Sequence, residues 1–127
     1  MAVLLQPYIP KVAEVGETSL IFFNGNFSHA IRRQPQAGDF RANSAYGVQI
    51  SAQSVDKNII SKAQNVLSKL PEKTGYARVD GTIIGDQFLL NELELIEPAL
   101  YLDKAIGSPQ GFAKALKSCI YDINQGK

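Results

Sequence analysis

Three acidic residues, Asp80, Glu92 and Glu94, have the chemistry and the spacing of a candidate metal site. Residues two apart on a strand point to the same side, so the Cβ atoms of Glu92 and Glu94 would lie roughly 7 Å apart. Two carboxylates at that distance repel by about 2 to 2.5 kcal/mol at an effective dielectric of about 20, but by only about 0.6 kcal/mol in water. A hard divalent cation such as Mg²⁺ would reverse the sign of this interaction, because it takes oxygen ligands and shares them with substrate phosphates.

Spacing alone leaves other interpretations of these carboxylates open. They could belong to a solvated strand edge, where charge discourages aggregation. They could also form the carboxylate pair of an unrelated α+β enzyme such as a glycoside hydrolase, although the chain has no tryptophan and no aromatic platform beside them. Strand alternation predicts one face with Phe88, Leu90, Glu92, Glu94 and Ile96, and an opposite face with Leu89, Asn91, Leu93 and Leu95.

Two β-hairpins should position the acidic residues. The first has apolar arms on either side of Asn24-Gly25, a pair that tolerates the positive φ angles of a type I′ turn. The second joins strands over residues 76–82 and 88–95 through a turn at Gly85-Asp86. Asp80 lies on its first arm and both glutamates on its second, so the hairpin would bring the three carboxylates onto neighbouring strands.

The remaining segments predict an α+β fold. Residues 3–9 read as a short strand that Pro10 ends, and residues 34–46 as a loop. Helical spacing of apolar residues predicts an amphipathic helix over 53–70, and a second helix begins at Ser108 with Pro109 in its first turn. We therefore expect a mainly antiparallel sheet with helices packed on one face.

Bulk composition excludes several classes of protein. The 127 residues, 45% of them hydrophobic, suit one globular domain. A formal charge of +1 gives no global field for nucleic acid or anionic membranes. The single cysteine, Cys119, argues against a disulfide scaffold and favours a cytoplasmic location. The first residues lack a basic region that would mark a signal peptide, and no stretch reaches the roughly 20 apolar residues of a membrane helix.

Four segments, taken together and in order, resemble the C-terminal part of the ATP-grasp ligases, most closely the prokaryotic glutathione synthetase branch. They are LQPYIP at 5–10, GETSLIFFNG with its RRQP exit at 16–35, GDFRANSAYG at 38–47, and ARVDG at 77–81 followed by NELELIEP at 91–98. Each segment is weak alone, but the set spans most of the chain.

The resemblance implies a role for particular residues. Gln6, Tyr8 and Ile9 would lie on the strand whose backbone meets adenine, and Arg33 would approach phosphate. Arg41 would steady the transferring phosphoryl group with its forked guanidinium, and Asn43 would order the same loop. The three carboxylates match the metal positions of the family, with Glu94 standing where an asparagine is usual.

Three further residues receive no catalytic role. Ser19 stands where several relatives carry a basic residue, after the acidic Glu17. His29, the only histidine, sits within an apolar strand and is interpreted as structural.

The resemblance also implies a function. The whole enzyme would be an ATP-dependent carboxylate–amine ligase that acts through an acyl phosphate, with ATP, one or two Mg²⁺ ions for which Mn²⁺ could substitute, a small carboxylate and an amine. Residues 1–127 would be a single-domain, C-terminal ATP-grasp fragment without the N-terminal and central domains, and would lack turnover alone. The alternative is a non-catalytic binding or interaction module derived from ATP-grasp. Neither reading involves nucleic acid or membrane, and both leave homo-oligomers open.

Overall fold

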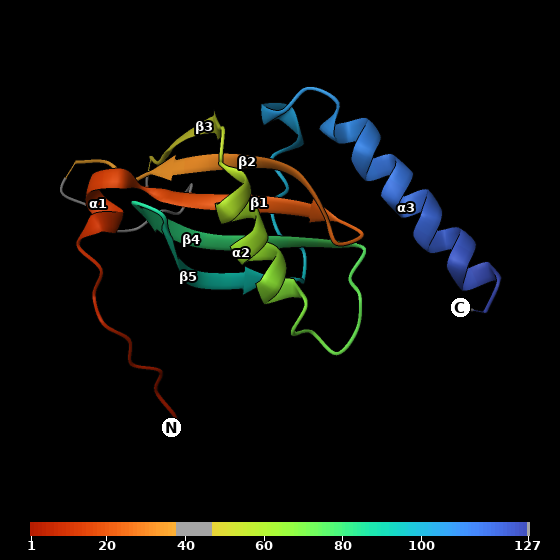
Figure 1. Cartoon of the computed structure of the whole chain (residues 1–127), viewed down its shortest axis with the longest axis horizontal. Helices are drawn as coiled ribbons and strands as arrows, with labels where there is room; N and C mark the ends of the chain where they lie inside the picture. The colour runs from red at the N-terminus through yellow and green to blue at the C-terminus, as the bar shows by residue number, and fades with distance from the viewer. Residues whose placement is uncertain (38–46, 127) are drawn as a thin grey trace.

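The computed structural model describes residues 1–37 and 47–126 and has an α+β architecture around one antiparallel sheet (Figure 1). The strand order is β3-β2-β1-β4-β5. The elements are α1 (Lys11–Val15), β1 (Glu17–Phe23), β2 (Asn26–Gln34), β3 (Gln49–Gln53), α2 (Lys57–Leu67), β4 (Tyr76–Ile84), β5 (Gln87–Glu94), the 3₁₀ helix η2 (Leu102–Lys104) and α3 (Ser108–Asn124). The predicted fold class is therefore confirmed.

Both predicted hairpins form. β1 pairs with β2 around Asn24 and Gly25, whose φ angles of 49° and 77° are those that a tight turn of this kind requires. β4 pairs with β5 around a turn that contains Gly85 at φ 61°. β1 also pairs with β4, so the two hairpins join edge to edge into one sheet.

The helices cover opposite faces of the sheet, and the prediction that they share one face was wrong. On one face Leu20, Phe22 and Val79 pack with Ile59 and Ala63 of α2. On the other, Ile21, Phe23 and Ile31 form a second cluster with Ala115 of α3. Every residue of β1 is buried, because this central strand is covered on both sides. Figure 1 shows α2 lying across the sheet and α3 projecting from the end where β1 turns into β2.

The N-terminal segment differs from its prediction. Residues 1–9 form no strand, and Val3, Leu4 and Leu5 are exposed. Pro7 and Pro10 lack the N–H groups that a strand would offer to a neighbour, and the segment pairs with neither outer strand of the sheet, β3 or β5. The helix predicted over 53–70 is also shorter, since Gln53 ends the edge strand β3 and Asp56 caps α2 through a 3.0 Å hydrogen bond from the Ile59 N–H.

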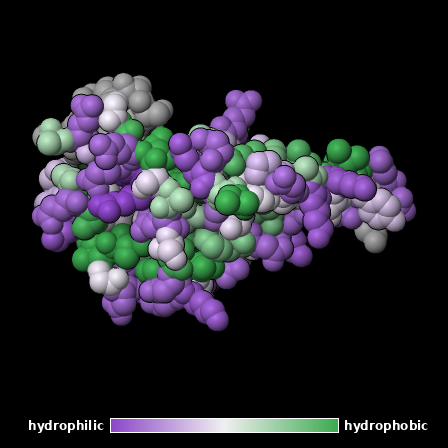
Figure 2. All heavy atoms as spheres, turned by 90° about the horizontal axis from the view of Figure 1, so that it is seen from above, coloured by the Kyte–Doolittle hydropathy of each residue, from purple (hydrophilic) through white to green (hydrophobic). Residues whose placement is uncertain are grey.

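α3 carries exposed apolar residues along its outer side, among them Leu116, Ile120 and Ile123. In Figure 2 the projecting arm is mostly hydrophilic, with some apolar surface between the hydrophilic side chains. Within the described ranges, neither α3 nor any shorter helix has the length and hydrophobicity of a transmembrane span.

Gly81 provides a test of the packing between β4 and β5. A Cβ at this position would lie 2.5 Å from the Leu89 carbonyl oxygen and 2.5 Å from the Phe88 ring. We expect Gly81→Ala to lower the free energy of unfolding by about 1–3 kcal/mol, since backbone must move to relieve the overlap. The matched control is Gly111→Ala in α3, where the nearest neighbour is Phe23 at 3.7 Å, and where alanine should raise stability by up to about 1 kcal/mol. Urea denaturation of both variants measures the difference, and equal midpoints would contradict this packing.

Candidate metal and nucleotide site

One end of the sheet gathers charged side chains onto a single face. Register places Glu17 opposite Arg33, Asp80 opposite Glu92, and Arg78 opposite Glu94. Ser19 of β1 stands opposite Asp80. We call this group the ionic cluster and define it as Glu17, Arg33, Arg78, Asp80, Glu92 and Glu94. It lies on the same sheet face as the α3 core cluster, because Glu17 and Ser19 alternate in phase with Ile21 and Phe23.

Asp80 is the fully buried centre of the ionic cluster. The Arg78 Nε donates to both of its carboxylate oxygens, at 3.0 and 3.1 Å, and the Arg78 Nη2 donates at 2.9 Å. The Arg33 Nη2 donates to Asp80 Oδ2 at 2.8 Å. A buried carboxylate is tolerated when it is paired and hydrogen-bonded in this way, so the two arginines offset the cost of burying Asp80.

A β-bulge at Asn91 sets the direction of the glutamates. Asp80 pairs with Glu92 while the next residue, Gly81, pairs with Leu90, so Asn91 is the extra residue of β5. The extra residue shifts the side-chain alternation by one. Phe88 and Leu93 consequently pack on the same α2-facing cluster, although uninterrupted alternation predicted opposite faces for them. The prediction that Phe88 and Leu90 share a face with the glutamates was therefore wrong.

The structure brings the three predicted metal-site residues together. One carboxylate oxygen from each of Asp80, Glu92 and Glu94 lies within 4.8 Å of the others. Glu92 is exposed and Glu94 half-buried, so the group opens to solvent on the β5 side. Three oxygen donors around one point are the ligand set that hard divalent cations prefer, and these residues therefore fit Mg²⁺ or Mn²⁺.

Two members of the ionic cluster were not assigned a role from the sequence. Glu17 forms an ion pair with Arg33 and accepts a 2.9 Å hydrogen bond from the Asn91 amide. Burial raises the pKa of Glu17 above 4.5; the Arg33 charge and the Asn91 hydrogen bond act against this, while Asp80 and Glu92 add to it. Glu17 is a charged residue at the start of a strand that is buried on both faces, and this unusual position could have marked it as part of a site.

Arg78 was the other omission, and its position two residues before Asp80 on one strand could have revealed it. It forms ion pairs with Asp80 and Glu94, donates to the Ala99 carbonyl at 3.2 Å, and lies 5.9 Å from the centre of the Tyr101 ring. Burial alone would lower the pKa of Arg78, but hydrogen bonding and attraction to Asp80 together with the charge of Glu94 raise it above its ordinary value. Arg78 therefore stays charged.

Arg33, predicted from the resemblance to approach phosphate, is buried within the ionic cluster at 8% exposure. Its contacts with Glu17 and Asp80 hold three neighbouring strands together at this end of the sheet. A contact with phosphate stays a prediction. Arg41 and Asn43 lie outside the described residues.

A pocket of about 300 Å³ adjoins the ionic cluster through Asn91. Its walls come from the N-terminal segment and from the β4–β5 hairpin, and the lining residues are Gln6, Pro7, Ile9, Val12, Thr82, Phe88, Leu89, Leu90 and Asn91. Gln6 and Ile9, two of the predicted adenine contacts, thus share one cavity with the hairpin. Tyr8 is 65% exposed and is not part of this lining.

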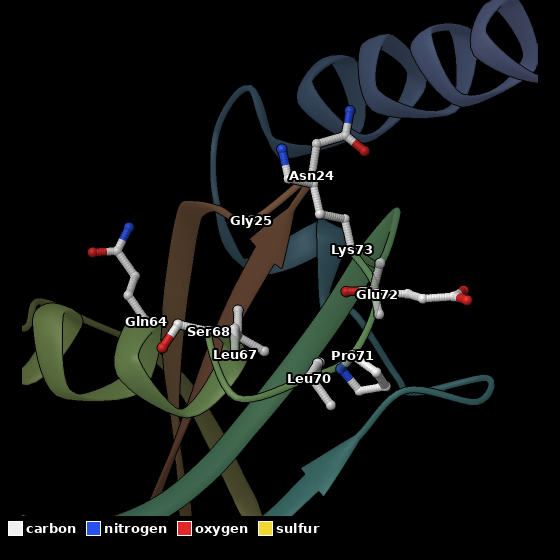
Figure 3. A pocket seen from close by; sticks show the side chains of 10 residues that line it. Asn24, Gly25, Gln64, Leu67, Ser68, Leu70, Pro71, Glu72 and Lys73 are labelled. Carbon is white, nitrogen blue, oxygen red and sulfur yellow. The ribbon is translucent and has the colours of Figure 1, made fainter. Parts of the chain in front are cut away.

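A larger pocket, of about 480 Å³, lies at the other end of the sheet (Figure 3). It is formed by the β1–β2 turn at Asn24 and by the segment after α2, with Leu67, Leu70 and Pro71 among its apolar residues. β1 runs from Glu17 to Phe23, so about 20 Å separate this pocket from the ionic cluster. None of the three carboxylates of the metal group lines it.

His29 packs against the segment that follows β5. Its Nε2 lies 2.8 Å from the Leu100 carbonyl oxygen and its Nδ1 lies 2.8 Å from the Ser28 hydroxyl. Burial lowers its pKa, which favours the neutral ring. These contacts agree with the structural role expected for it.

Comparison with known proteins gives four similarities. The family model of the prokaryotic glutathione synthetase ATP-grasp domain matches residues 1–102. A glutathione synthetase of Prochlorococcus marinus subsp. pastoris is 33% identical over 72 residues, which are 57% of this chain and 22% of that protein. The crystal structure of the D-cycloserine synthetase DcsG superimposes with a TM-score of 0.72 and 30% identity, over 87% of this chain and 40% of that one.

A D-alanine–D-alanine ligase from Bacillus anthracis, solved in complex with ATP, shares the fold at a TM-score of 0.60 and 16% identity. The match covers 83% of this chain and 36% of the ligase. The chain thus spans less than half the length of each of these proteins.

Proposed function

This chain belongs to the prokaryotic glutathione synthetase ATP-grasp domain family, and from that membership we propose that Asp80, Glu92 and Glu94 hold Mg²⁺ against the phosphates of ATP. The observation that carries the proposal is the convergence of three carboxylate oxygens, from two strands, within 4.8 Å. Like charges so close repel strongly in a partly buried site, and a divalent cation removes that cost.

The nucleotide would lie between the N-terminal segment and the β4–β5 hairpin. In the 300 Å³ pocket Gln6 and Ile9 would meet the adenine edge, and Phe88 and Leu89 would give it apolar walls. Asn91 lines this pocket and also bonds Glu17 in the ionic cluster. The base and the metal-bound phosphates would therefore lie on either side of the Asn91 bulge. Tyr8, Arg33, Arg41 and Asn43 are further proposed contacts, on the strength of the family resemblance.

The reaction we propose is ATP-dependent ligation of a small carboxylate to an amine through an acyl phosphate. Bound Mg²⁺ would neutralise phosphate charge as the substrate carboxylate approaches. The protein's part is alignment: Asp80 is fixed by two arginines, while Glu92 and Glu94 reach it from the neighbouring strand. Because this chain spans 22–40% of the relatives above, polypeptide outside these 127 residues would complete the nucleotide clamp and the substrate sites.

Calorimetric titration of the purified chain with MgCl₂ and ADP tests the proposal. We expect binding that Glu92→Gln weakens at least tenfold, about 1.4 kcal/mol, because one of three carboxylate ligands is lost. Glu92 is exposed, so the variant should keep its fold. The matched control is Glu72→Gln, an exposed glutamate in the pocket at the other end of the sheet, which should bind as the wild type does. Absence of binding by the wild type would instead favour the interaction-module interpretation.

A further inference from the structure

The arginine that the sequence did not single out sits between two of the proposed metal ligands. The Arg78 Nη2 lies 2.9 Å from Asp80 Oδ2 and also contacts Glu94 Oε2. Both carboxylates belong to the three whose oxygens converge. A guanidinium and a divalent cation both seek carboxylate lone pairs, so they compete where they approach the same oxygen, as at Glu94 Oε2.

We propose that Arg78 is the resident counter-ion of the metal carboxylates, and that a divalent cation binds by displacing its guanidinium from Glu94. The inference rests on the proposed function, since it concerns the same site. Arg78 is a positioning residue here: it acts through Asp80 and Glu94 and holds them close together without metal, when their charges would otherwise drive them apart.

The contacts indicate which partner gives way. Asp80 is fully buried and receives three hydrogen bonds from Arg78 and one from Arg33, which hold it in place. The Glu94 side chain is 31% exposed and contacts Arg78 through Nη2. Arg78 would keep its bond to the Ala99 carbonyl and its place near the Tyr101 ring after that contact breaks. The exchange therefore needs only a rotation of the Glu94 side chain, while Arg78 stays in its place.

The charges of the ionic cluster agree with such an exchange. Among its members, four carboxylates face two guanidinium groups, which leaves an excess of two negative charges when all are ionised. One divalent cation balances that excess. Arg78 and the cation would nevertheless repel each other across a few ångströms, so the arginine should lower the affinity of the site for metal.

Titration of Mn²⁺ into the wild-type chain and into Arg78→Gln, followed by electron paramagnetic resonance of free Mn²⁺, tests this inference. We expect the variant to bind Mn²⁺ about tenfold more tightly, since a competitor and a repelling charge are both removed. The control Arg32→Gln removes the same charge from β2, which is separated from β4 by β1, and on the opposite, α2 face of the sheet. It should leave the affinity unchanged. Equal or weaker binding by Arg78→Gln would overturn the inference while the proposed function stands; no binding by either protein would overturn both.

A second measurement does not depend on the variant's folding. In a ¹⁵N-arginine spectrum of the wild type, adding Mg²⁺ should shift the Arg78 Nε–H and guanidinium signals, because the Glu94 contact is lost, while those of Arg32 stay in place. Mg²⁺ binding with no change at Arg78 would overturn the inference.

Discussion

Replacing Asp80 by alanine should lower the free energy of unfolding by about 3–5 kcal/mol, the cost of removing one partner from a buried ion pair. Asp80 is completely buried and is shared by Arg33 and Arg78, both less than a tenth exposed. Without it, the two guanidinium groups would face each other with only Glu17 and Glu94 to balance them. The loss should be visible as a large shift of the urea midpoint.

Asp103→Ala is the control for the Asp80 prediction. The Asp103 side chain is 71% exposed and pairs only with Lys104 among its described contacts, and exposed pairs of this kind contribute less than about 1 kcal/mol. A midpoint for Asp80→Ala within error of that for Asp103→Ala would show that the buried arginine contacts do not stabilise the fold.

Arg33→Met should be strongly destabilised at pH 7, by about 3–5 kcal/mol, and should recover stability on acidification. Burial already raises the pKa of Glu17 above 4.5, and Arg33 is the main influence that lowers it. Without Arg33 the folded-state pKa of Glu17 rises further. Between the two pKa values the folded protein binds a proton that the unfolded chain does not. The free energy of unfolding therefore increases as the pH falls from 7 toward 4.5, and decreases as the pH rises.

Urea denaturation of Arg33→Met at pH 7 and pH 5 measures this effect. Arg32→Met is the matched control, because it removes the same charge from the neighbouring residue without touching Glu17. The expected result is a gain in stability at pH 5 for Arg33→Met relative to the control. A parallel loss of stability in both variants would contradict the pairing of Arg33 with Glu17. The effects at Arg33 and Asp80 should not be additive, since the two side chains are in contact.

Local sequence signals predicted much of this fold because the features concerned depend on adjacent residues. Asn24-Gly25 and Gly85-Asp86 encode their turns through the φ angles they tolerate, and both hairpins form. The hairpin at Gly85 places Asp80 on the strand next to Glu92 and Glu94, but it is the Asn91 bulge that turns the two glutamates onto the face of Asp80.

Features that depend on distant partners were predicted less well. The Asn91 bulge is a property of how β5 pairs with β4. The sequence prediction did not include this bulge, so it placed the residues before Asn91 on the wrong face of the sheet. The placement of α2 and α3 on opposite faces depends on which strands neighbour β1, since a central strand buried on both sides shows no alternation of polarity. The apolar residues at 3–9 suggested a strand, yet this segment pairs with neither outer strand of the sheet, β3 or β5.

The most direct test of the metal site is anomalous diffraction at the manganese edge from crystals of this chain grown with MnCl₂ and ADP. Our account predicts an anomalous peak bounded by carboxylate oxygens of Asp80, Glu92 and Glu94, at about 2.0–2.5 Å from each, with Glu94 turned away from Arg78. Ordered carboxylates without a peak between them, and with the Arg78–Glu94 ion pair intact at saturating Mn²⁺, would contradict it.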